Sequence, residues 1–356
     1  MPSRGAALPA IAAVVFIVGL AIVLATGASS GTWGYDFEAY AQAARRLLDG
    51  RPLYDSTVDL AGGFAVFLYP PPFAIAFVPF ALLGSVAGLW AWTALLTACV
   101  VGGIALMPVS SRIRWVVLLL AGLHWPSLYA IRLGQVGPIL LLLFVLGWRW
   151  LDRPGSLGGV VGLGALIKVQ PGLLVVWALL TGRVRAAVTA SAVVIAACVV
   201  TLPVVGVAAW RDYVTLLGRV SQPIETPHNF TPGAVLFRAG LPADAATVVH
   251  WAVVALALAL VVLAVVRRDR IGPAPGYLVA VVASQLISPL LWDHYAIILL
   301  APVAWLLQRG VRWAVLLPLA TAVPLVGSVP DVVYPSSFII VIVAVLWRSR
   351  AAGDAS

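Results

Sequence analysis

The sequence predicts an all-α protein that crosses a lipid membrane many times. Of its 356 residues, 62% are hydrophobic and only 10% are charged, and the mean hydropathy is +1.06. Apolar runs cover nearly the whole chain, and a run of about 20 such residues is what one helix needs to cross a bilayer. We therefore expect one polytopic membrane domain over residues 1–356, without a sizeable soluble domain.

The first apolar run, Ala6 to Thr26, is too long for the core of a signal peptide and lacks a convincing cleavage site. We expect it to remain as the first span. Beyond it we expect a first external loop over residues 28–69 and, further along, a second over residues 210–242.

A short amphipathic helix is predicted inside the first external loop. Apolar residues recur there at spacings of three and four, from Phe37 to Leu48. Asp36 precedes this stripe and Gly50 follows it, which are start and stop signals for a helix. Beside a membrane span, such a helix is expected to lie flat on the bilayer with its stripe toward lipid. Asp36 would then be a functional carboxylate at the interface or only the N-cap.

Arginine clusters predict the topology. The positive-inside rule places them in the cytoplasm, so neighbouring clusters are separated by an even number of crossings. This arrangement gives about 12 transmembrane or re-entrant helices with both termini cytoplasmic. Pro70 to Leu83 is expected to dip in or lie on the surface, and the next full span to run from Ser85 to Met107. The clusters are Arg112 and Arg114, Arg149 and Arg153, Arg183 and Arg185, Arg267, Arg268 and Arg270, Arg309 and Arg312, and Arg348 and Arg350.

Only about 30 residues separate Arg153 from Arg183, which is short for two full spans. If both clusters are cytoplasmic, the segment is a hairpin of two short helices, 157–167 and 171–181, with Lys168 at its tip. Alternatively, residues 157–180 form one span with Lys168 near mid-membrane, at a cost of about 3 kcal/mol. We favour the hairpin.

Polar residues gather on the predicted external side. They lie in the two external loops, between His124 and Gln135, at the Lys168 tip and around His294. Ionisable groups collected at one membrane face indicate a site there. The chain has no Gly-rich phosphate loop, no zinc-type His/Cys spacing and no Asp-x-Asp pair, so we expect no metal and no cofactor. The net charge of +9 is accounted for by loop arginines, and we expect membrane lipid and no nucleic acid as a partner.

The external groups suggest a chemistry. One well-placed carboxylate, Asp36, is accompanied by several cations. A carboxylate base with phosphate-binding cations is suited to moving a sugar from a phosphate leaving group to a hydroxyl. The cations are Arg132, Lys168, Arg211, Arg238 and His294.

A family resemblance supports this interpretation. The pattern Asp36-Phe37-x-x-Tyr40-x-x-Ala43, continuing to Leu48-x-Gly50-x-x-Leu53-Tyr54-Asp55, resembles the first external loop of glycosyltransferase family 87. Further segments resemble that family in the same order, from Asp36 to about Pro302. They are Tyr69-Pro70-Pro71-Pro72-Phe73, Gly134-Gln135-Val136, Lys168-Val169-Gln170-Pro171, Asn229-Phe230-Thr231 with Pro232-Gly233 and Arg238, and Ser288-Pro289-Leu290-Leu291-Trp292-Asp293-His294-Tyr295.

The resemblance implies a GT-C membrane enzyme with its active site facing outward. The Arg-rich, Lys-poor and Ala/Val-rich composition suggests a bacterium, so we expect the enzyme in a bacterial plasma membrane. The implied donor is a polyprenyl-monophosphate sugar, mannose first and arabinofuranose second. The implied acceptor is a glycolipid or a cell-envelope glycan.

The resemblance also implies residue roles. Asp36 would be the general base of an inverting transfer. His294 would contact the donor phosphate, or be an interfacial histidine between aromatic anchors. Lys168 would contact phosphate or substrate, or be a solvated tip.

Five further residues are candidate substrate contacts. Gln135 and Asn229 would bind sugar hydroxyls, although turn chemistry explains Asn229 equally well. Tyr40 belongs to the first motif, and Arg132 and Arg238 are cations without an assigned partner.

Two other classes of protein stay open. A transporter or flippase of lipid-linked envelope precursors would need cations along the full depth of a pathway, whereas most here fall at one face. A non-catalytic assembly subunit would be expected to lose Asp36 or its helix.

Overall fold

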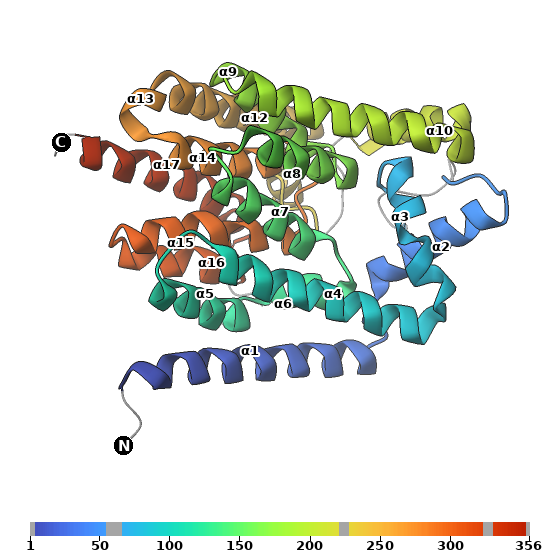
Figure 1. The fold of residues 1–356 in the computed structure, drawn as a ribbon, viewed down its shortest axis with the longest axis horizontal. Coiled ribbons are helices and arrows are strands. Elements are labelled where there is room, and N and C mark those ends of the chain that lie inside the picture. The colour runs from blue at the N-terminus through green and yellow to red at the C-terminus, as the bar shows by residue number, and fades with distance from the viewer. Residues whose placement is uncertain (1–3, 55–65, 221–227, 323–329, 354–356) are drawn as a thin grey trace.

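The computed structural model describes residues 4–54, 66–220, 228–322 and 330–353. Regular structure within these ranges is helical, apart from an isolated β-bridge between Asn229 and Trp292. The all-α class predicted from the sequence is confirmed for this part of the chain (Figure 1). The helices of the first half are α1 (Arg4–Ser29), α2 (Tyr35–Leu48), α3 (Pro71–Leu82), α4 (Gly84–Leu106), α5 (Ser111–Leu123), α6 (Trp125–Leu133), α7 (Gly137–Arg149), α8 (Pro154–Ile167), η1 (Gln170–Gly172), α9 (Leu173–Leu180) and α10 (Val184–Val220). Those of the second half are α11 (Pro232–Arg238), α12 (Ala243–Val266), α13 (Arg268–Ile271), α14 (Pro273–Leu286), η2 (Asp293–Leu299), α15 (Leu300–Gln308), η3 (Arg312–Val315), α16 (Leu316–Ala322) and α17 (Val333–Gly353).

Four described helices, α1, α4, α10 and α12, are long and apolar enough to cross a membrane. The pair α5 and α6, bent by 66° at its break, would make a fifth span. Other apolar helices are shorter, at 10–17 residues. The expected total of about 12 membrane helices therefore remains a prediction, because helices of this length need a partner segment to span a bilayer.

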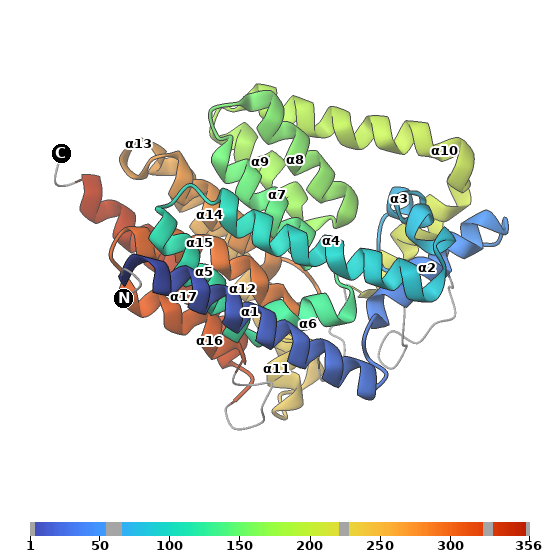
Figure 2. The same cartoon turned by 60° about the horizontal axis from the view of Figure 1, so that its bottom comes forward.

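The helices form one elongated bundle. Figure 1 shows α1 along one edge and α10 along the opposite edge. In the turned view of Figure 2, α1 comes to the front and α10 stays along the far edge. Helix α14 belongs to the interior, because every residue from Pro275 to Leu286 is buried. The start of α1 and the end of α17 lie at one end of the bundle, and α2 and α3 lie at the other (Figures 1 and 2).

Helix α2 forms where the sequence predicted it, but its apolar stripe does not face lipid. Phe37 packs edge-on against Phe77 of α3, with ring centroids 5.3 Å apart. Tyr40 is fully buried between Phe73 and Trp92. The expectation of a helix lying with its stripe on the bilayer is therefore wrong, because α3 and α4 supply an aromatic surface that covers the stripe.

The segment between Arg153 and Arg183 doubles back on itself. Helix α8 ends at Ile167 and α9 follows η1, yet a guanidinium nitrogen of Arg183 donates to the carbonyl oxygen of Leu151. Two helices running on in one direction would separate these residues by about 48 Å at 1.5 Å per residue. The segment is therefore a hairpin with Lys168 at its turn, as the spacing of the arginine clusters predicted.

The expected loop over residues 210–242 is largely helical. Helix α10 continues to Val220 after a break at Gly206, whose φ of 75° and ψ of 163° are not helical. A residue with a side chain is rarely stable at this φ, so glycine permits the break. Helix α11 then occupies Pro232–Arg238, and residues 221–227 lie outside the described part. The length of the apolar run concealed this bend, because hydropathy does not register a change in helix direction.

Candidate active site

Asp36 is held by the first turn of α2. The N-cap position is occupied by Gly34, with φ 82°, and Asp36 lies inside the helix without a capping role. The Gly34 N–H donates to the carbonyl oxygen of Arg132 at 2.8 Å, which fixes the start of α2 against the end of α6. The alternative in which Asp36 is only an N-cap is therefore wrong. Its carboxylate is available for another role.

Gln135 lies beside Asp36 because two segments approach closely. Gly134 has φ 80°, and a Cβ atom there would lie 2.9 Å from the Cβ of Phe37 in α2. Trp92 of α4 donates to the Gly134 carbonyl oxygen at 2.7 Å. Only glycine allows this turn and this contact together, so the Gly134-Gln135 motif brings the amide to Asp36.

The surroundings of Asp36 change its acidity. Burial raises the pKa of this half-buried carboxyl from 3.8 to about 7, and the negative charge of Asp293 acts in the same direction. The positive charge of Lys168 and a hydrogen bond from Gln135 lower the pKa and thereby limit the rise. A carboxyl that titrates near neutrality can take and release a proton at physiological pH.

Lys168 faces the same space from the tip of the hairpin. Its Nζ donates to the Tyr295 hydroxyl at 2.8 Å and lies 4.1 Å from the centroid of that ring. Gln170 donates to the Ser288 hydroxyl at 2.7 Å, which ties the tip to the segment before η2. Burial lowers the pKa of Lys168 to about 7, while the charge of Asp36 opposes this fall.

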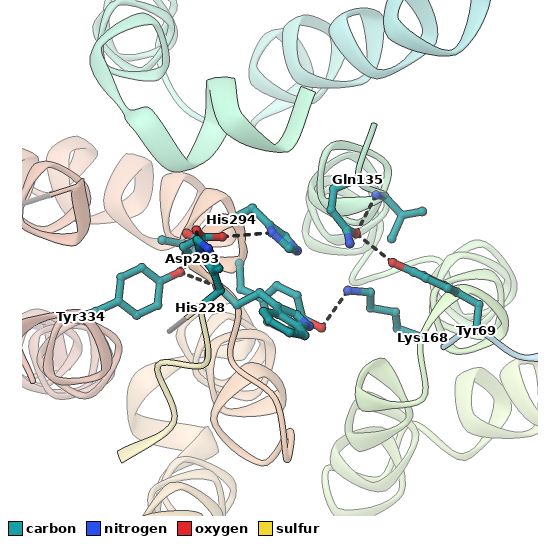
Figure 3. Close-up of polar contacts among 11 residues, drawn as sticks. Tyr69, Gln135, Lys168, His228, Asp293, His294 and Tyr334 are labelled. Atoms are coloured by element: carbon teal, nitrogen blue, oxygen red, sulfur yellow. Dashed lines mark hydrogen bonds and ion pairs between the residues drawn. The ribbon is translucent and has the colours of Figure 1, made fainter. Parts of the chain in front are cut away.

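A histidine, a carboxylate and a second histidine line the other side (Figure 3). One oxygen of the buried Asp293 lies 3.1 Å from His228 Nδ1, and the other lies 3.3 Å from His294 Nδ1. The Tyr334 hydroxyl donates to the Asp293 carbonyl oxygen at 2.7 Å. His294 is 4% exposed, and its Nε2 has no hydrogen-bond partner among the described residues. An unsatisfied buried nitrogen is unfavourable unless a ligand or water completes it.

Asn229 attaches one wall of the site to another. Its Oδ1 accepts hydrogen bonds from the N–H groups of Thr231 and Leu291, at 3.1 and 3.2 Å. The N–H of Phe230 donates to the Leu291 carbonyl oxygen at 2.7 Å. The 229–231 segment therefore holds the backbone just before Asp293. The Nδ2 of Asn229 has no hydrogen-bond partner among the described residues, so the predicted contact to a sugar hydroxyl stays a prediction.

More than half of the chain matches a known family. The sequence model of glycosyltransferase family 87 matches residues 67–291. The chain belongs to glycosyltransferase family 87. The match contains Gln135, Lys168 and Asn229, whereas Asp36 and His294 lie outside it.

Relatives of this chain have been assigned functions. The family 87 chain is 31% identical over 302 residues to a polyprenol-phosphate-mannose-dependent alpha-(1-2)-phosphatidylinositol pentamannoside mannosyltransferase of Mycolicibacterium smegmatis. This match covers 78% of the chain and 72% of the relative. The chain is 32% identical over 199 residues to a polyprenol-phosphate-mannose-dependent alpha-(1-2)-phosphatidylinositol mannoside mannosyltransferase of Mycobacterium tuberculosis, covering 50% of this chain and 46% of that relative. The chain thus matches about half the length of the second relative. No solved structure gives a significant match.

In this family 87 chain, three residues predicted to contact substrate are engaged by other residues of the same chain. Arg132 donates from Nε to the Thr32 hydroxyl at 2.9 Å and from Nη2 to the Ser30 hydroxyl at 3.0 Å. Arg238 forms an ion pair with Asp331 at 2.7 Å and donates to the Asn229 carbonyl oxygen at 2.7 Å. Tyr40 is fully buried, so it does not reach a sugar in this conformation.

The next acidic residue on α2, Glu38, is not part of the site. Glu38 pairs with Arg45 on the opposite side of α2. Asp55 lies outside the described residues.

Sequence reasoning missed three members of the site: His228, Asp293 and Tyr295. All three lie within or beside the quoted motifs, so a signal was present. Their roles depend on contacts between segments that are far apart in sequence, which motif order does not show.

Proposed function

We propose that this chain is an integral-membrane glycosyltransferase that moves mannose from a polyprenyl-phosphate donor to a hydroxyl of a glycolipid or cell-envelope glycan. The observation that carries the proposal is the convergence of Asp36, Lys168 and His294 from three distant segments on one site. The relatives named above depend on polyprenol-phosphate-mannose and act on phosphatidylinositol mannosides, which favours the same donor and a glycolipid acceptor here.

In this mechanism Asp36 is the general base. The acceptor hydroxyl oxygen attacks the anomeric carbon while the bond from that carbon to the phosphate oxygen breaks. The bonding pair leaves with the phosphate, and the hydroxyl proton passes to Asp36. Attack opposite the leaving group inverts the anomeric carbon. A pKa near 7 lets Asp36 accept this proton and later release it to water.

Lys168 and His294 are the proposed contacts of the donor phosphate. The phosphate gains negative charge as the sugar leaves, so a nearby ammonium and a directed N–H stabilise the transition state more than the ground state. His294 Nε2 is a buried ring nitrogen without a hydrogen-bond partner among the described residues. Asp293 beside Nδ1 and a phosphate bound beside Nε2 would together favour the charged, donating form of the ring, which burial alone disfavours.

The proposal places the site at the outer face of the membrane. Helix α2 lies at the end of the bundle away from the start of α1 and the end of α17 (Figure 1). This arrangement agrees with the predicted cytoplasmic termini.

Cysteine labelling tests this orientation. In a background lacking Cys99 and Cys198, cysteine at the exposed position Gln42 is expected to react with a membrane-impermeant maleimide added to intact cells. Cysteine at Val184, which is 55% exposed, is expected to react only after the cells are opened. The reverse pattern would contradict the orientation without affecting the chemistry.

The base is tested by Asp36→Asn, with Glu38→Gln as the matched control on the same helix. Membranes containing each variant are supplied with labelled polyprenyl-phosphate mannose or, separately, polyprenyl-phosphate arabinofuranose. Loss of a positioned base is expected to lower transfer by about 10²–10⁴-fold. Glu38→Gln is expected to transfer at the wild-type rate, because Glu38 faces Arg45 and not the site.

The outcomes separate the alternatives. Transfer from polyprenyl-phosphate mannose by wild type and Glu38→Gln, but not by Asp36→Asn, supports this donor and supports Asp36 as the base. Equal transfer by all three would refute Asp36 as the base. No transfer from either donor, combined with movement of the donor lipid across the bilayer, would favour the flippase.

A further inference from the structure

Behind Asp36 lies a chain of buried polar side chains that the proposed mechanism does not use. Tyr40 lies one helical turn after Asp36 on α2, Tyr69 immediately precedes Pro70 and α3, and Gln135 follows α6. Their exposed fractions are 0%, 4% and 4%. None of them is open to contact with a sugar or a lipid. Their polar groups must therefore serve the protein itself.

The chain runs in one direction, and its geometry fixes that direction. Gln135 Oε1 lies 3.0 Å from the Val136 backbone N–H, which can only donate, so the atom facing it must be the amide oxygen. The Tyr69 hydroxyl lies 2.9 Å from the same oxygen and must therefore donate to it (Figure 3). Because the hydrogen of the Tyr69 hydroxyl is used in this bond, the Tyr69 oxygen accepts a hydrogen bond from the Tyr40 hydroxyl at 2.8 Å.

The amide NH₂ group of Gln135 lies beyond these bonds. With Oε1 committed to two donors, the NH₂ group is the part of Gln135 that remains to interact with Asp36, and as a donor it lowers the pKa of that carboxyl. Linked hydrogen bonds polarise one another, so each donor upstream strengthens the last one. Resting on the proposed role of Asp36, we propose that Tyr69 and Tyr40 are positioning residues that orient the Gln135 amide onto the catalytic base.

The surroundings suit this role. Tyr69 is held in place from both sides: its backbone carbonyl oxygen accepts from the Tyr54 hydroxyl at 2.6 Å, and three prolines follow it. The Tyr40 ring packs edge-on against those of Tyr69 and Phe73, at 4.9 and 5.1 Å. Rigid neighbours keep the hydroxyls aligned, so the amide cannot rotate to present its oxygen to Asp36.

Other groups also act on Asp36. The charged ones are Lys168, whose charge lowers its pKa, and Asp293, whose charge raises it. The phenols that interact with its charge are Tyr40, Tyr69, Tyr129 and Tyr295. The contribution of the chain must therefore be separated from that of Lys168. A phenol-to-phenyl change accomplishes this, because it removes a hydroxyl and leaves every charge in place.

The test is the pH profile of kcat/KM for Tyr69→Phe, with Tyr277→Phe as the matched control. Both changes remove one buried hydroxyl, but the Tyr277 hydroxyl donates to the backbone carbonyl oxygen of Phe144 at 3.0 Å and has no contact with the chain to Asp36. A hydrogen bond to the ionised carboxylate lowers its pKa, so loss of its alignment raises the pKa and protonates the base up to a higher pH. The acid limb of Tyr69→Phe is expected to move upward by about half to one pH unit.

A second pair of variants tests whether Tyr69 acts through Gln135. Gln135→Met removes the donor and is expected to move the acid limb at least as far as Tyr69→Phe. Adding Tyr69→Phe to Gln135→Met is expected to produce no further shift, because the route to Asp36 is already lost. Tyr40→Phe is expected to shift the limb less, being one hydrogen bond further away.

The inference and the proposed function fail in different ways. An unmoved acid limb in Tyr69→Phe and Gln135→Met, or an equal shift in Tyr277→Phe, would overturn the inference while Asp36→Asn stayed inactive. Additive shifts in the double variant would show that Tyr69 acts independently of Gln135 and would also overturn it. Wild-type transfer by Asp36→Asn would instead refute the proposed base.

Discussion

Two buried histidines show what distinguishes a structural side chain from one prepared for a ligand. His124 and His294 are 0% and 4% exposed, and each lies at an interruption between helices. In the core, His124 has a partner for both ring nitrogens: Ser127 Oγ at 2.7 Å and Thr321 Oγ1 at 3.0 Å. In the site, His294 has Asp293 beside Nδ1, and its Nε2 is without a partner among the described residues.

The difference lies in what the rest of the fold supplies. Thr321 is 197 residues away from His124 in sequence, and it satisfies the ring only after α16 has packed against α6. A satisfied ring stabilises the break between α5 and α6 and has no capacity left for a ligand. An unsatisfied ring beside a carboxylate is costly to the fold and useful to a negatively charged substrate.

Alanine substitution at the two positions is expected to give opposite results. His294→Ala removes the proposed phosphate donor and is expected to lower transfer by about 100-fold with little change in melting temperature. His124→Ala leaves the buried Ser127 hydroxyl without its partner, removes one of the two partners of the Thr321 hydroxyl and creates a cavity. It is expected to cost about 2 kcal/mol of stability while the folded fraction keeps its activity. The measurements are transfer per folded molecule and thermal unfolding in detergent.

Specific results would break this comparison. Lost activity in His124→Ala at an unchanged melting temperature would place His124 in the catalytic machinery. A melting temperature lowered as much in His294→Ala as in His124→Ala would make His294 a structural residue as well.

Hydropathy predicted where individual helices lie along the chain better than it predicted what each helix packs against. The predicted spans Ala6–Thr26 and Ser85–Met107 correspond to α1 (Arg4–Ser29) and α4 (Gly84–Leu106). Apolar length alone determines such elements. The environment of α2 could not be predicted in this way, because an amphipathic stripe suits a lipid surface and an aromatic protein surface equally well.

For the site, motif order brought the right segments together but did not reveal which groups remain available. Lys168 and His294 both face the site, whereas Arg132 is bound by Ser30 and Thr32. Arg238 is paired with Asp331, 93 residues further along the chain. Such pairings arise from tertiary packing and leave no local pattern in a single sequence. Counting external cations therefore overestimated the number that could meet a phosphate.

The smallest effect that we expect concerns the pH dependence of kcat/KM. It tests the part played by Lys168, one of the two proposed phosphate contacts. Asp36 and Lys168 both have a pKa of about 7 and interact, so the limbs of the rate profile belong to the pair. Below these values Asp36 is protonated and cannot act as a base; above them Lys168 loses the charge that stabilises the phosphate. The profile of kcat/KM is therefore expected to be a narrow bell centred near pH 7.

The Lys168→Arg variant tests this assignment. Its guanidinium stays charged at all accessible pH values, so the alkaline limb is expected to flatten while the acid limb persists. Measured with a water-soluble donor analogue, an unchanged alkaline limb would assign phosphate binding to His294 alone, and the comparison of satisfied and unsatisfied groups would then account for the whole leaving-group site.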